Sequence, residues 1–568
     1  MHLIQLLKEL SLQPQSTQEL RGLILDLAIR GRLTKEWREE HPEVEPAATL
    51  LERIEREKAR LVKEKIIRKS KYQLPLTEEE ISFPLPKNWV WCRLANLVVL
   101  RSGTTFKKSE ELSKGDYLYI KVGTMNLPGN EELITTSDMY IQHNPKVEKA
   151  LIPPNSIIFP KRGGAIATNK KRIVKSHILV DLNTMALTPL YEGIFHYIKI
   201  WFDSVDLWIL NSGTSVPQIN NKDIEPLPIP LPPLAEQKAI VEIVDQLLAE
   251  VDALEAQLQQ RVQLKEDYVT AALRQLTRQA PAPAWAALQP HFKRAFDTPG
   301  SVEQLRQAIL QLAVQGQLTA PWRRAHPDTE PAGVLLEQIQ AEKARLVQEK
   351  QIKKQKALPP IEAEEVPFEL PEGWVWCRLG EVTTIGGGKR VPAGYKLKKV
   401  PTPHIYLRVS DMKNGSVDDS NLHYIDKHLF EKIQRYTISK DELYMTIVGA
   451  TIGKSGLIPP RFDGVNLTEN AAKIRPLIIL KEYIKVAFDS SLMQDQFIDK
   501  TKQVGVQKMA LYRFKSSALP LPPLAEQKAI VALVDDLLGA CDRLGAGLEE
   551  REGLLGDLMK ASVREVRN

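Results

Sequence analysis

The sequence is poor in cysteine and has no long apolar run. Its 568 residues include three cysteines, too few for the disulfide scaffold of a small secreted domain. A reducing, cytoplasmic location is therefore expected. No segment approaches the roughly 18 to 20 apolar residues of a membrane-spanning helix. Lys8 and Glu9 interrupt the apolar start before a signal-peptide core could form, so membrane and secreted proteins are not expected.

A strong excess of one charge is also missing. The 77 Lys and Arg residues against 71 Asp and Glu residues give a net charge of +6. This balance is compatible with a nucleic-acid partner but does not indicate one, because dense charge of both signs is also typical of a solvated surface. The length suffices for about three to five domains of roughly 100 to 200 residues.

Motifs for catalysis are scarce. No Cys-x-x-Cys pair, His-x-x-x-His pair or Gly-x-Ser-x-Gly nucleophile motif occurs. Residues 449–455, GATIGKS, end like a phosphate-binding loop, but only three residues separate the two glycines, whereas a Walker A loop has four. We therefore expect a glycine-rich bend between strands, with Lys454 available for a DNA phosphate. A nuclease of dispersed carboxylates and one lysine stays open at this point.

The chain does contain an internal repeat. The segment LRGLILDLAIRGRLT from Leu20 recurs as LRQAILQLAVQGQLT from Leu305, a shift of 285 positions. The same shift carries LLERIEREKARLVKEK from Leu50 onto LLEQIQAEKARLVQEK, and it carries the first WVWCRL onto the second. A third block, PLPPLAEQKAIV, begins at Pro230 and again at Pro520, a shift of 290. The chain is therefore interpreted as a tandem duplication.

Between these blocks lie two inserts, residues 95–229 and 380–519, that show no convincing alignment. The matched blocks predict that one surface for a partner protein is present twice in the chain. Unmatched inserts predict that two different things are bound or read.

The repeated blocks have helical periodicity. Residues 52–65 and 337–350 are rich in Glu, Lys, Arg, Ala and Leu and are expected to form exposed amphipathic helices. Their tails, residues 63–71 and 350–356, are basic; a solvated linker is the main interpretation and phosphate contact the alternative. Prolines then end each helix and lead into an extended Trp-Val-Trp strand.

Two longer helices are expected after the third block. Pro233 and Pro523 suit a first helical turn, and each helix can continue for about 40 residues, or about 60 Å. Each helix carries an apolar heptad seam, and we expect the two seams to pair as an antiparallel spacer between the inserts. The seam residues are Ile240, Val244, Leu247, Val251, Leu254 and Leu258 in the first helix, and Ile530, Val534, Leu537, Cys541, Leu544 and Leu548 in the second.

The three cysteines are predicted to be buried apolar residues. Cys541 belongs to the second seam, and Cys92 and Cys377 lie beside tryptophans in expected strands. None of them is expected to act as a nucleophile or a metal ligand.

The inserts carry polar and basic clusters among β-like segments. Glycines allow close approach to a groove, Arg and Lys neutralise phosphates or reach guanine, and Asn can pair with adenine. For each single residue a solvated loop is an equal alternative. The candidates for DNA contact in the first insert are Thr104, Thr105, Lys107, Lys121, Lys161, Arg162, Thr168, Asn169, Lys170, Lys171, Arg172 and Gln218. Those in the second are Lys389, Arg390, Lys398, Arg408, Ser410, Lys413, Lys454, Gln507, Lys508 and Arg513.

The repeated motifs resemble those of a known family. LILDLAIRGRLT and ILQLAVQGQLT, FPLPKNWVWCRL and FELPEGWVWCRL, and the two copies of PLPPLAEQKAIV resemble the DNA-specificity subunit of bacterial type I restriction-modification systems over essentially the whole chain. The resemblance implies a non-catalytic subunit of class α/β (α+β). Two mixed α/β target recognition domains are expected, separated by long antiparallel coiled-coil helices in an internal duplication with pseudo-two-fold symmetry.

The resemblance also implies partners. Double-stranded DNA, two methyltransferase subunits and restriction/translocase subunits are expected, and a membrane is not. S-adenosylmethionine, ATP and Mg²⁺ are then expected on the partner subunits, with no cofactor bound by this chain. A coiled-coil scaffold without sequence-specific DNA binding is the alternative, and an enzyme that uses residues 449–455 is a third hypothesis.

The expected domains follow the repeat. They are an N-terminal helical segment (1–75), target recognition domain 1 (76–232), a central long helix (233–280), a second helical segment (281–360), target recognition domain 2 (361–522) and a C-terminal long helix (523–568).

Overall fold

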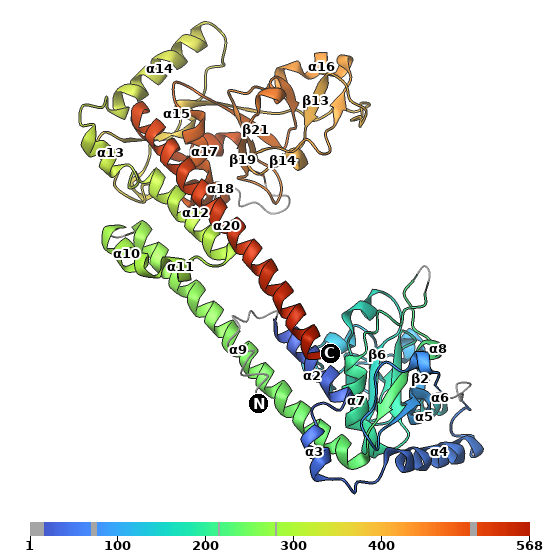
Figure 1. Cartoon of the computed structure of the whole chain (residues 1–568). Helices are drawn as coiled ribbons and strands as arrows, with labels where there is room; N and C mark the ends of the chain where they lie inside the picture. The colour runs from blue at the N-terminus through green and yellow to red at the C-terminus, as the bar shows by residue number, and fades with distance from the viewer. Residues whose placement is uncertain (1–15, 70–75, 214–215, 279–280, 500–507, 568) are drawn as a thin grey trace. The chain divides into compact units, whose positions relative to one another are not determined.

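A computed structural model gives the fold of residues 16–69, 76–213, 216–278, 281–499 and 508–567. The chain divides into two compact units (Figure 1). Unit 1 contains residues 1–261 and 555–568, and unit 2 contains residues 262–554. Within these described parts, no helix combines the length and the apolar composition that a bilayer crossing requires.

Each copy of the repeat starts with short helices. The first copy has α2 (Ser16–Ile29), α3 (Lys35–Glu40) and α4 (Ala47–Lys63). The second has α10 (Pro281–Leu288), α11 (Phe292–Ala295), α12 (Pro299–Val314), α13 (Ala320–Ala325) and α14 (Ala332–Gln348). Helices α4 and α14 confirm the predicted amphipathic helices. Both begin earlier than expected because Pro46 and Pro331, in extended conformation, precede the first turn.

The two long helices are also confirmed. They are α9 (Leu234–Arg278), of 45 residues, and α20 (Leu524–Arg567), of 44 residues. Pro233 and Pro523 lie one residue before the first turn, and their carbonyls accept the backbone N–H of Gln237 and Gln527. The prolines therefore initiate the helices without belonging to them.

The expected pairing of one seam with the other is wrong for the seam residues, because each seam packs against the short helices of its own unit. Ile240, Val244 and Val251 lie in one apolar cluster with Leu20 and Ile24 of α2. In unit 2 the second seam packs with α12; this cluster includes Leu305, Ala308, Ile309, Ile530, Val534, Cys541 and Leu548.

The last turns of α9, which belong to unit 2, join the same cluster as the second seam. Val269 and Leu276 of α9 share it with Cys541 of α20. Lys265 of α9 forms an ion pair with Asp297, and Arg551 of α20 donates to the Asp297 carbonyl. Residue numbers thus rise along α9 as they fall along α20, so these stretches of the two helices are antiparallel.

Between the short helices and the long helix, each copy contains a mixed α/β domain. The Trp-Val-Trp segment forms its first strand and pairs antiparallel with the strand that leads into the long helix. These pairs are β1 (Val90–Arg93) with β10 (Pro228–Leu231), and β11 (Val375–Arg378) with β22 (Ala518–Leu521).

The first domain contains a five-stranded sheet of order β2-β9-β6-β7-β4 and a three-stranded sheet of order β5-β3-β8. The strands are β2 (Val98–Ser102), β3 (Tyr117–Ile120), β4 (Leu133–Ile134), β5 (Tyr140–Ile141), β6 (Ser156–Pro160), β7 (Arg172–Val174), β8 (Leu179–Val180) and β9 (Thr184–Pro189). The helices are α5 (Leu94–Leu97), α6 (Pro145–Ala150), α7 (Phe195–Ser204) and α8 (Asn221–Ile224).

The second domain has four-stranded sheets of orders β12-β21-β18-β19 and β16-β13-β20-β17, and a small hairpin of β14 and β15. Its strands are β12 (Thr383–Gly387), β13 (His404–Leu407), β14 (Met412–Lys413), β15 (Ser416–Val417), β16 (Tyr424–Ile425), β17 (Thr437–Ile438), β18 (Leu443–Thr446), β19 (Ser455–Leu457), β20 (Val465–Leu467) and β21 (Ala471–Pro476). The helices are α15 (Leu379–Val382), α16 (Lys427–Ile433), α17 (Lys481–Asp489), α18 (Ser491–Asp499) and α19 (Leu511–Lys515).

The two inserts share a fold although their sequences do not align. The order β2-β9-β6-β7 matches β12-β21-β18-β19, and the parallel pair β3 and β8 matches β13 and β20. In both domains a buried tyrosine of the following helix donates to a proline carbonyl of the last strand: Tyr197 to Pro230 and Tyr483 to Pro520, each at 2.6 Å. Two mixed α/β domains in a tandem duplication, as expected, are confirmed.

The three cysteines lie where the sequence predicts. Cys92 and Cys377 occupy β1 and β11, Cys541 lies in α20, and all are buried with free thiols. Burial raises the pKa of the Cys92 and Cys377 thiols far above the usual value, which keeps them protonated and unreactive.

Candidate nucleic-acid interface

A buried carboxylate fixes the first domain to its long helix. Glu236, in the first turn of α9, is completely buried. Its carboxylate accepts hydrogen bonds from Thr34 (2.7 Å), Arg38 (2.5 Å) and the indole Nε1 of Trp89 (2.7 Å). These partners lie beside α3, in α3 and directly before β1, so one side chain joins the short helices, the recognition domain and the spacer helix.

The second copy repeats this junction. Glu526 is also fully buried and accepts from Thr319 (2.6 Å), Trp374 (2.8 Å) and Arg323. A buried carboxylate is tolerated only when charge-assisted hydrogen bonds compensate its desolvation. These residues are not among the candidates predicted from the sequence, and the signal that could have found them is their recurrence at equivalent positions of the repeated blocks.

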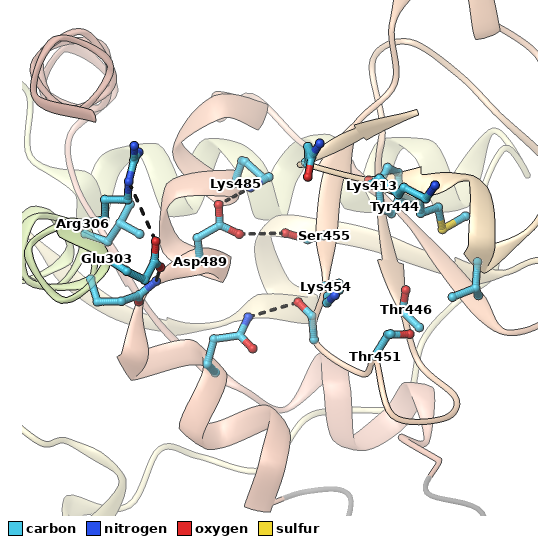
Figure 2. A pocket seen from close by; sticks show the side chains of 18 of the residues that line it. Glu303, Arg306, Lys413, Tyr444, Thr446, Thr451, Lys454, Ser455, Lys485 and Asp489 are labelled. Carbon is cyan, nitrogen blue, oxygen red and sulfur yellow. Dashed lines mark hydrogen bonds and ion pairs between the residues drawn. The ribbon is translucent and has the colours of Figure 1, made fainter. Parts of the chain in front are cut away.

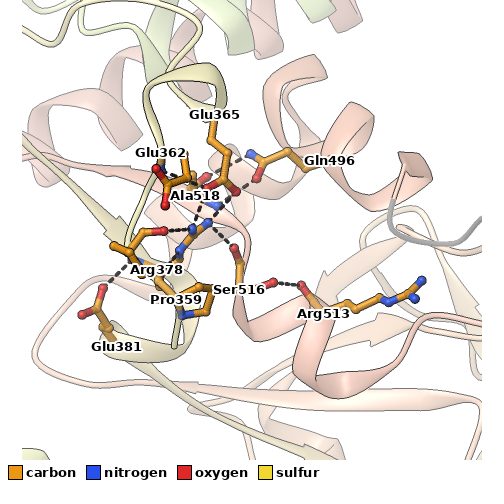
Figure 3. Close-up of polar contacts among 10 residues, drawn as sticks. Pro359, Glu362, Glu365, Arg378, Glu381, Gln496, Arg513, Ser516 and Ala518 are labelled. Carbon is orange, nitrogen blue, oxygen red and sulfur yellow. Dashed lines mark hydrogen bonds and ion pairs between the residues drawn. The ribbon is translucent and has the colours of Figure 1, made fainter. Parts of the chain in front are cut away.

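A second junction holds each linker against its domain. Arg378, at the end of β11, pairs with Glu365 at 2.6 Å and donates to the carbonyls of Pro359 (3.0 Å) and Ser516 (2.6 Å), as Figure 3 shows. In the first copy Arg93 binds Glu80 and a carbonyl near β10 in the same way. The pKa of Glu80 falls to about 2 chiefly because Arg93 hydrogen-bonds it.

Several candidate residues of the first domain gather at one end of the five-stranded sheet. There β2 and β6 end and β9 begins, because Ser102 pairs with Met185 and Pro160 with Thr184. We call the loops that leave the sheet here open end 1: residues 103–105, 161–171 and 181–183, with Gln218. Within it, Lys161 donates to Ser102 at 3.0 Å and Arg162 forms a backbone bridge with Gln218.

The second domain has an equivalent open end. Here β12 and β18 end and β21 begins, because Gly387 pairs with Ala472 and Thr446 with Ala471. We call open end 2 the corresponding loops, residues 388–390, 447–454 and 468–470, with Lys508. Val448 forms a backbone bridge with Lys508, as Arg162 does with Gln218.

In each domain, glycine is required where the chain leaves the edge strand, β2 or β12. A Cβ on Gly103 would lie 1.9 Å from the Asp181 carbonyl oxygen, and one on Gly388 would lie 2.0 Å from that of Thr468. In both domains the backbone N–H of the next residue donates to a strand carbonyl: Thr104 to Val180 and Lys389 to Leu467, each at 2.9 Å.

Backbone contacts therefore identify equivalent positions in the two domains, which alignment of the two sequences does not. Tyr119 donates to the Thr104 carbonyl and Tyr406 to the Lys389 carbonyl, at 3.0 and 2.7 Å. Burial raises the pKa of both tyrosines to about 12, which keeps them as donors. Thr104 corresponds to Lys389, Arg162 to Val448 and Gln218 to Lys508, so equivalent positions carry different hydrogen-bonding and charged groups.

The candidate residues differ in solvent exposure. The exposed ones are Thr105, Lys107, Arg162, Thr168, Lys389, Arg390, Lys398, Ser410, Lys413, Lys454, Lys508 and Arg513. The partly exposed ones are Thr104, Lys121, Lys161, Asn169, Lys170, Arg172, Gln218 and Arg408. Gln507 lies outside the described residues.

Some candidates lie away from the open ends or already have partners. Lys121 pairs with Glu111 at 2.7 Å and Lys413 with Asp418 at 2.6 Å. Arg408 binds Asp411 through two nitrogens, the closer contact being 2.6 Å.

Lys171 and Asn169 have structural partners inside the first domain. Lys171 is buried, donates to the Val205 carbonyl at 2.6 Å and lies over the Phe202 ring. Burial lowers the pKa of its amine to about 8. Asn169 adopts a left-handed conformation, and its side-chain oxygen accepts from the Leu207 N–H at 3.0 Å.

The glycine-rich loop of residues 447–454 joins β18 to β19, as predicted. Gly449 and Gly453 have φ values of 90° and 91°, a conformation that glycine adopts readily. The loop borders a cavity of about 1030 Å³, shown in Figure 2, whose lining includes Thr446, Lys454 and Asp489. Strand pairing places Ser455 where the first domain has the buried Lys171, so a smaller side chain leaves this space open.

Among the described residues, no group of three or more His, Cys, Asp or Glu side chains is arranged to hold a metal ion.

Comparison with known proteins agrees with the repeated architecture. The family model described as the type I restriction modification DNA specificity domain matches residues 86–264 and again residues 371–551. The two matched segments correspond to the two copies of the mixed α/β domain and the first part of each long helix.

Full-length relatives have the same description. The chain is 30% identical to the type I restriction enzyme EcoAI specificity subunit of Escherichia coli, over 93% of this chain and 90% of that protein. It is 26% identical to the EcoEI specificity subunit of E. coli, over 94% and 91%. A solved structure of the HsdS subunit from Thermoanaerobacter tengcongensis is 17% identical, with a TM-score of 0.37 over 86% of this chain and 98% of that chain.

Proposed function

Because the chain belongs to the family of type I restriction-modification specificity subunits, we propose that its two open ends read the two halves of a split DNA site. As a member of this family the chain is a non-catalytic DNA specificity subunit with two target recognition domains.

One observation carries the proposal: equivalent backbone positions present different side chains in the two domains. Thr104 and Lys389 follow equivalent glycines and donate equivalent backbone hydrogen bonds. A shared fold sets the same approach to the groove, whereas different donors and acceptors select different base edges. Two unlike half-sites are the expected consequence.

The proposed contacts are the solvent-accessible candidates at the open ends. We leave out Lys171, which is buried, and Asn169, whose side-chain oxygen accepts a hydrogen bond from the Leu207 N–H. The set in the first domain is Thr104, Thr105, Lys161, Arg162, Thr168, Lys170 and Gln218; in the second it is Lys389, Arg390, Lys454 and Lys508.

The duplicated frame supports the proposed partners. The Glu236 and Glu526 junctions are the same in both copies, so two identical subunits can dock on equivalent surfaces. We propose two methyltransferase subunits, joined by restriction/translocase subunits in a cytoplasmic complex. S-adenosylmethionine, ATP and Mg²⁺ are assigned to those subunits. The domain bounds remain those given by the repeat, with recognition domains at 76–232 and 361–522.

Genome-wide mapping of DNA methylation in the host, with and without this chain, tests the proposed function. A bipartite motif of two unlike halves that is methylated only when the chain is present is the expected result. A methylation pattern that does not depend on the chain would favour the scaffold alternative.

A further inference from the structure

Unit 2 contains a basic groove outside the proposed open-end contacts. The groove runs between the linker after α14 and the edge strand β12, with a volume of about 550 Å³. Its charged lining residues are Lys353, Lys354, Lys356, Lys473, Arg475, Lys515 and Glu442. Tyr512, whose side chain is 50% exposed, also lines it. Six cations therefore face one carboxylate.

The positive charge of the groove is poorly compensated. Lys473 lies 3.9 Å from Glu442, the single acidic residue of the lining. Within the described residues, the side chains of Lys353, Lys354 and Lys515 make no hydrogen bond or ion pair. Like charges gathered in one groove repel each other, and a bound anion relieves that repulsion.

The groove is held in shape by the Arg378 junction (Figure 3). Arg378 donates to the carbonyls of Pro359 and Pro360 in the linker and of Ser516 at the end of α19. Because Ser516 follows Lys515 directly, the same guanidinium fixes the two sides of the groove together. The linker lysines are thus presented by an anchored segment.

In the first copy a carboxylate occupies the position of Lys515. The half-buried amine of Lys58 faces Glu55 and Glu225, and Glu225 is equivalent to Lys515 under the 290 shift. In the second copy, Lys343 faces one carboxylate, Glu381, and has Lys515 where the first copy has Glu225. Burial, and secondarily the charge of Lys515, lowers the pKa of Lys343 to about 8. A carboxylate in one copy is therefore replaced by an ammonium group in the other.

The groove is continuous with open end 2. Gly386, opposite Lys473 in the sheet, lines the groove and lies two residues before Gly388. Helix α19, which carries Tyr512 and Lys515, begins three residues after Lys508. A duplex end that leaves open end 2 along β12 meets the groove next.

We propose that this groove binds the phosphodiester backbone of DNA that continues beyond the half-site read by the second domain; this inference rests on the proposed function. Lysine and arginine neutralise phosphates without reading sequence. Tyr512 supplies an aromatic surface for packing against sugar. The groove adds affinity on one side of the target, because the first copy lacks the cation at the Lys515 position.

Matched variants of the full chain test the groove. The first is Lys353→Gln with Lys354→Gln, and its control is Arg68→Gln with Lys69→Gln, which occupy the same positions of the first copy under the 285 shift. A third variant, Lys515→Glu, places the first-copy residue in the second copy. The probe is duplex DNA with the mapped bipartite site, either flanked on both sides or trimmed beyond the second half-site. Binding is measured as a function of salt.

The groove variant is expected to bind the flanked duplex about tenfold more weakly near physiological salt, with a salt slope reduced by about 2. Lys515→Glu weakens binding in the same direction, and the first-copy control changes it by less than about twofold. Trimming the flank removes the difference between wild type and variant. The sequence preference stays unchanged in every variant.

Three results would overturn the groove proposal: an unchanged salt slope, an equal loss in the first-copy control, or a loss that persists on the trimmed duplex. Unchanged DNA binding with weakened docking of the methyltransferase subunits would assign the groove to an acidic protein surface and also overturn it. Failure of the wild-type chain to prefer its site over unrelated duplex counts against the proposed function instead, since the salt slope of the groove variant is a separate readout.

Discussion

At the residue scale, the strongest constraints are the two buried carboxylates of the long helices. Glu236 and Glu526 each accept three hydrogen bonds from side chains that are distant in sequence. Each carboxylate joins a short helix, the first strand of a recognition domain and a spacer helix. These residues therefore set how a domain that contacts DNA is mounted on the frame.

Glu236→Ala is expected to destabilise unit 1 by about 3 to 5 kcal/mol, the usual cost of removing one partner of a buried ion pair. Hydrogen–deuterium exchange should show lost protection in α3, β1 and the first turns of α9. The second copy is the internal control, because Glu526 still holds α13 and β11. Glu242→Ala, at an exposed position of α9, should change stability by less than about 0.5 kcal/mol. Equal losses in both copies, or none, would contradict the assigned role.

The amine of Lys343 predicts a pH dependence of stability. Its pKa falls from 10.5 to about 8 in the folded chain, first because of burial and then because of Lys515. Between these two values the unfolded chain binds more protons than the folded chain, so folding becomes more favourable as pH rises. Below about 8 both states are protonated and the contribution is constant.

Lys343→Met should therefore reduce the increase of stability between pH 8 and pH 10, measured as the urea midpoint of unit 2. Lys171→Met should act similarly in unit 1, since burial lowers that pKa to about 8 as well. A variant whose urea midpoint rises with pH as steeply as that of wild type would show that the amine does not titrate in this range.

The amino-acid composition of the inserts predicted candidate DNA contacts, but it did not predict which of those side chains are buried. Lys170 and Lys171 are adjacent in one basic run, yet Lys171 is buried against α7. Its burial depends on Phe202 and Val205, which lie more than thirty positions away and carry no local sequence signal. Side-chain burial of this kind is a tertiary property.

At the element scale, the end of each edge strand is defined by a glycine that touches a neighbouring loop. Gly103 and Gly388 leave no room for a side chain against Asp181 and Thr468. The same contact orients the loop that carries Thr104 or Lys389. Loop position at the open end is therefore coupled to the packing of the strand.

Gly388→Ala is expected to displace residues 388–390 and to weaken recognition of the second half-site at least about tenfold, because well-placed base contacts each contribute about 1 to 3 kcal/mol. Competition binding with duplexes altered in one half-site measures this. Gly123→Ala, in a loop of the first domain, is the control for an added Cβ, since its φ is −62° and nothing lies within 4 Å of that position. Loss of discrimination at the first half-site instead would contradict the assignment.

The helices and framing strands could be predicted from the sequence because they are long, periodic and repeated. The shared topology of the inserts could not. Their strands are two to six residues long, and their pairing is made by backbone hydrogen bonds that any residue can form. Only the register of those bonds shows that Arg162 and Val448 occupy equivalent positions.

At the scale of the whole molecule, the chain is one plan used twice with different recognition surfaces. The last turns of α9 and the middle of α20 share an apolar cluster in unit 2. This cluster joins the two copies through their spacer helices. Binding of a two-part site is expected to depend on it, because a linked second contact gains effective concentration.

Val269→Asp, at a fully buried position of α9, should lower affinity for the two-part site by at least about tenfold. Each recognition domain should keep its hydrogen-exchange protection. Val262→Asp, on the same helix but 39% exposed, is the matched control and should bind normally. Normal binding by the Val269 variant would show that the joint is not needed for simultaneous contact.

Each recognition domain is proposed to read its own half of the target. The direct test replaces residues 95–227, between β1 and β10, with the corresponding segment of another family member and maps methylation in cells that contain the partner subunits. The expected result is a motif in which one half changes while the other half is retained. A change in both halves, or in neither, would contradict it.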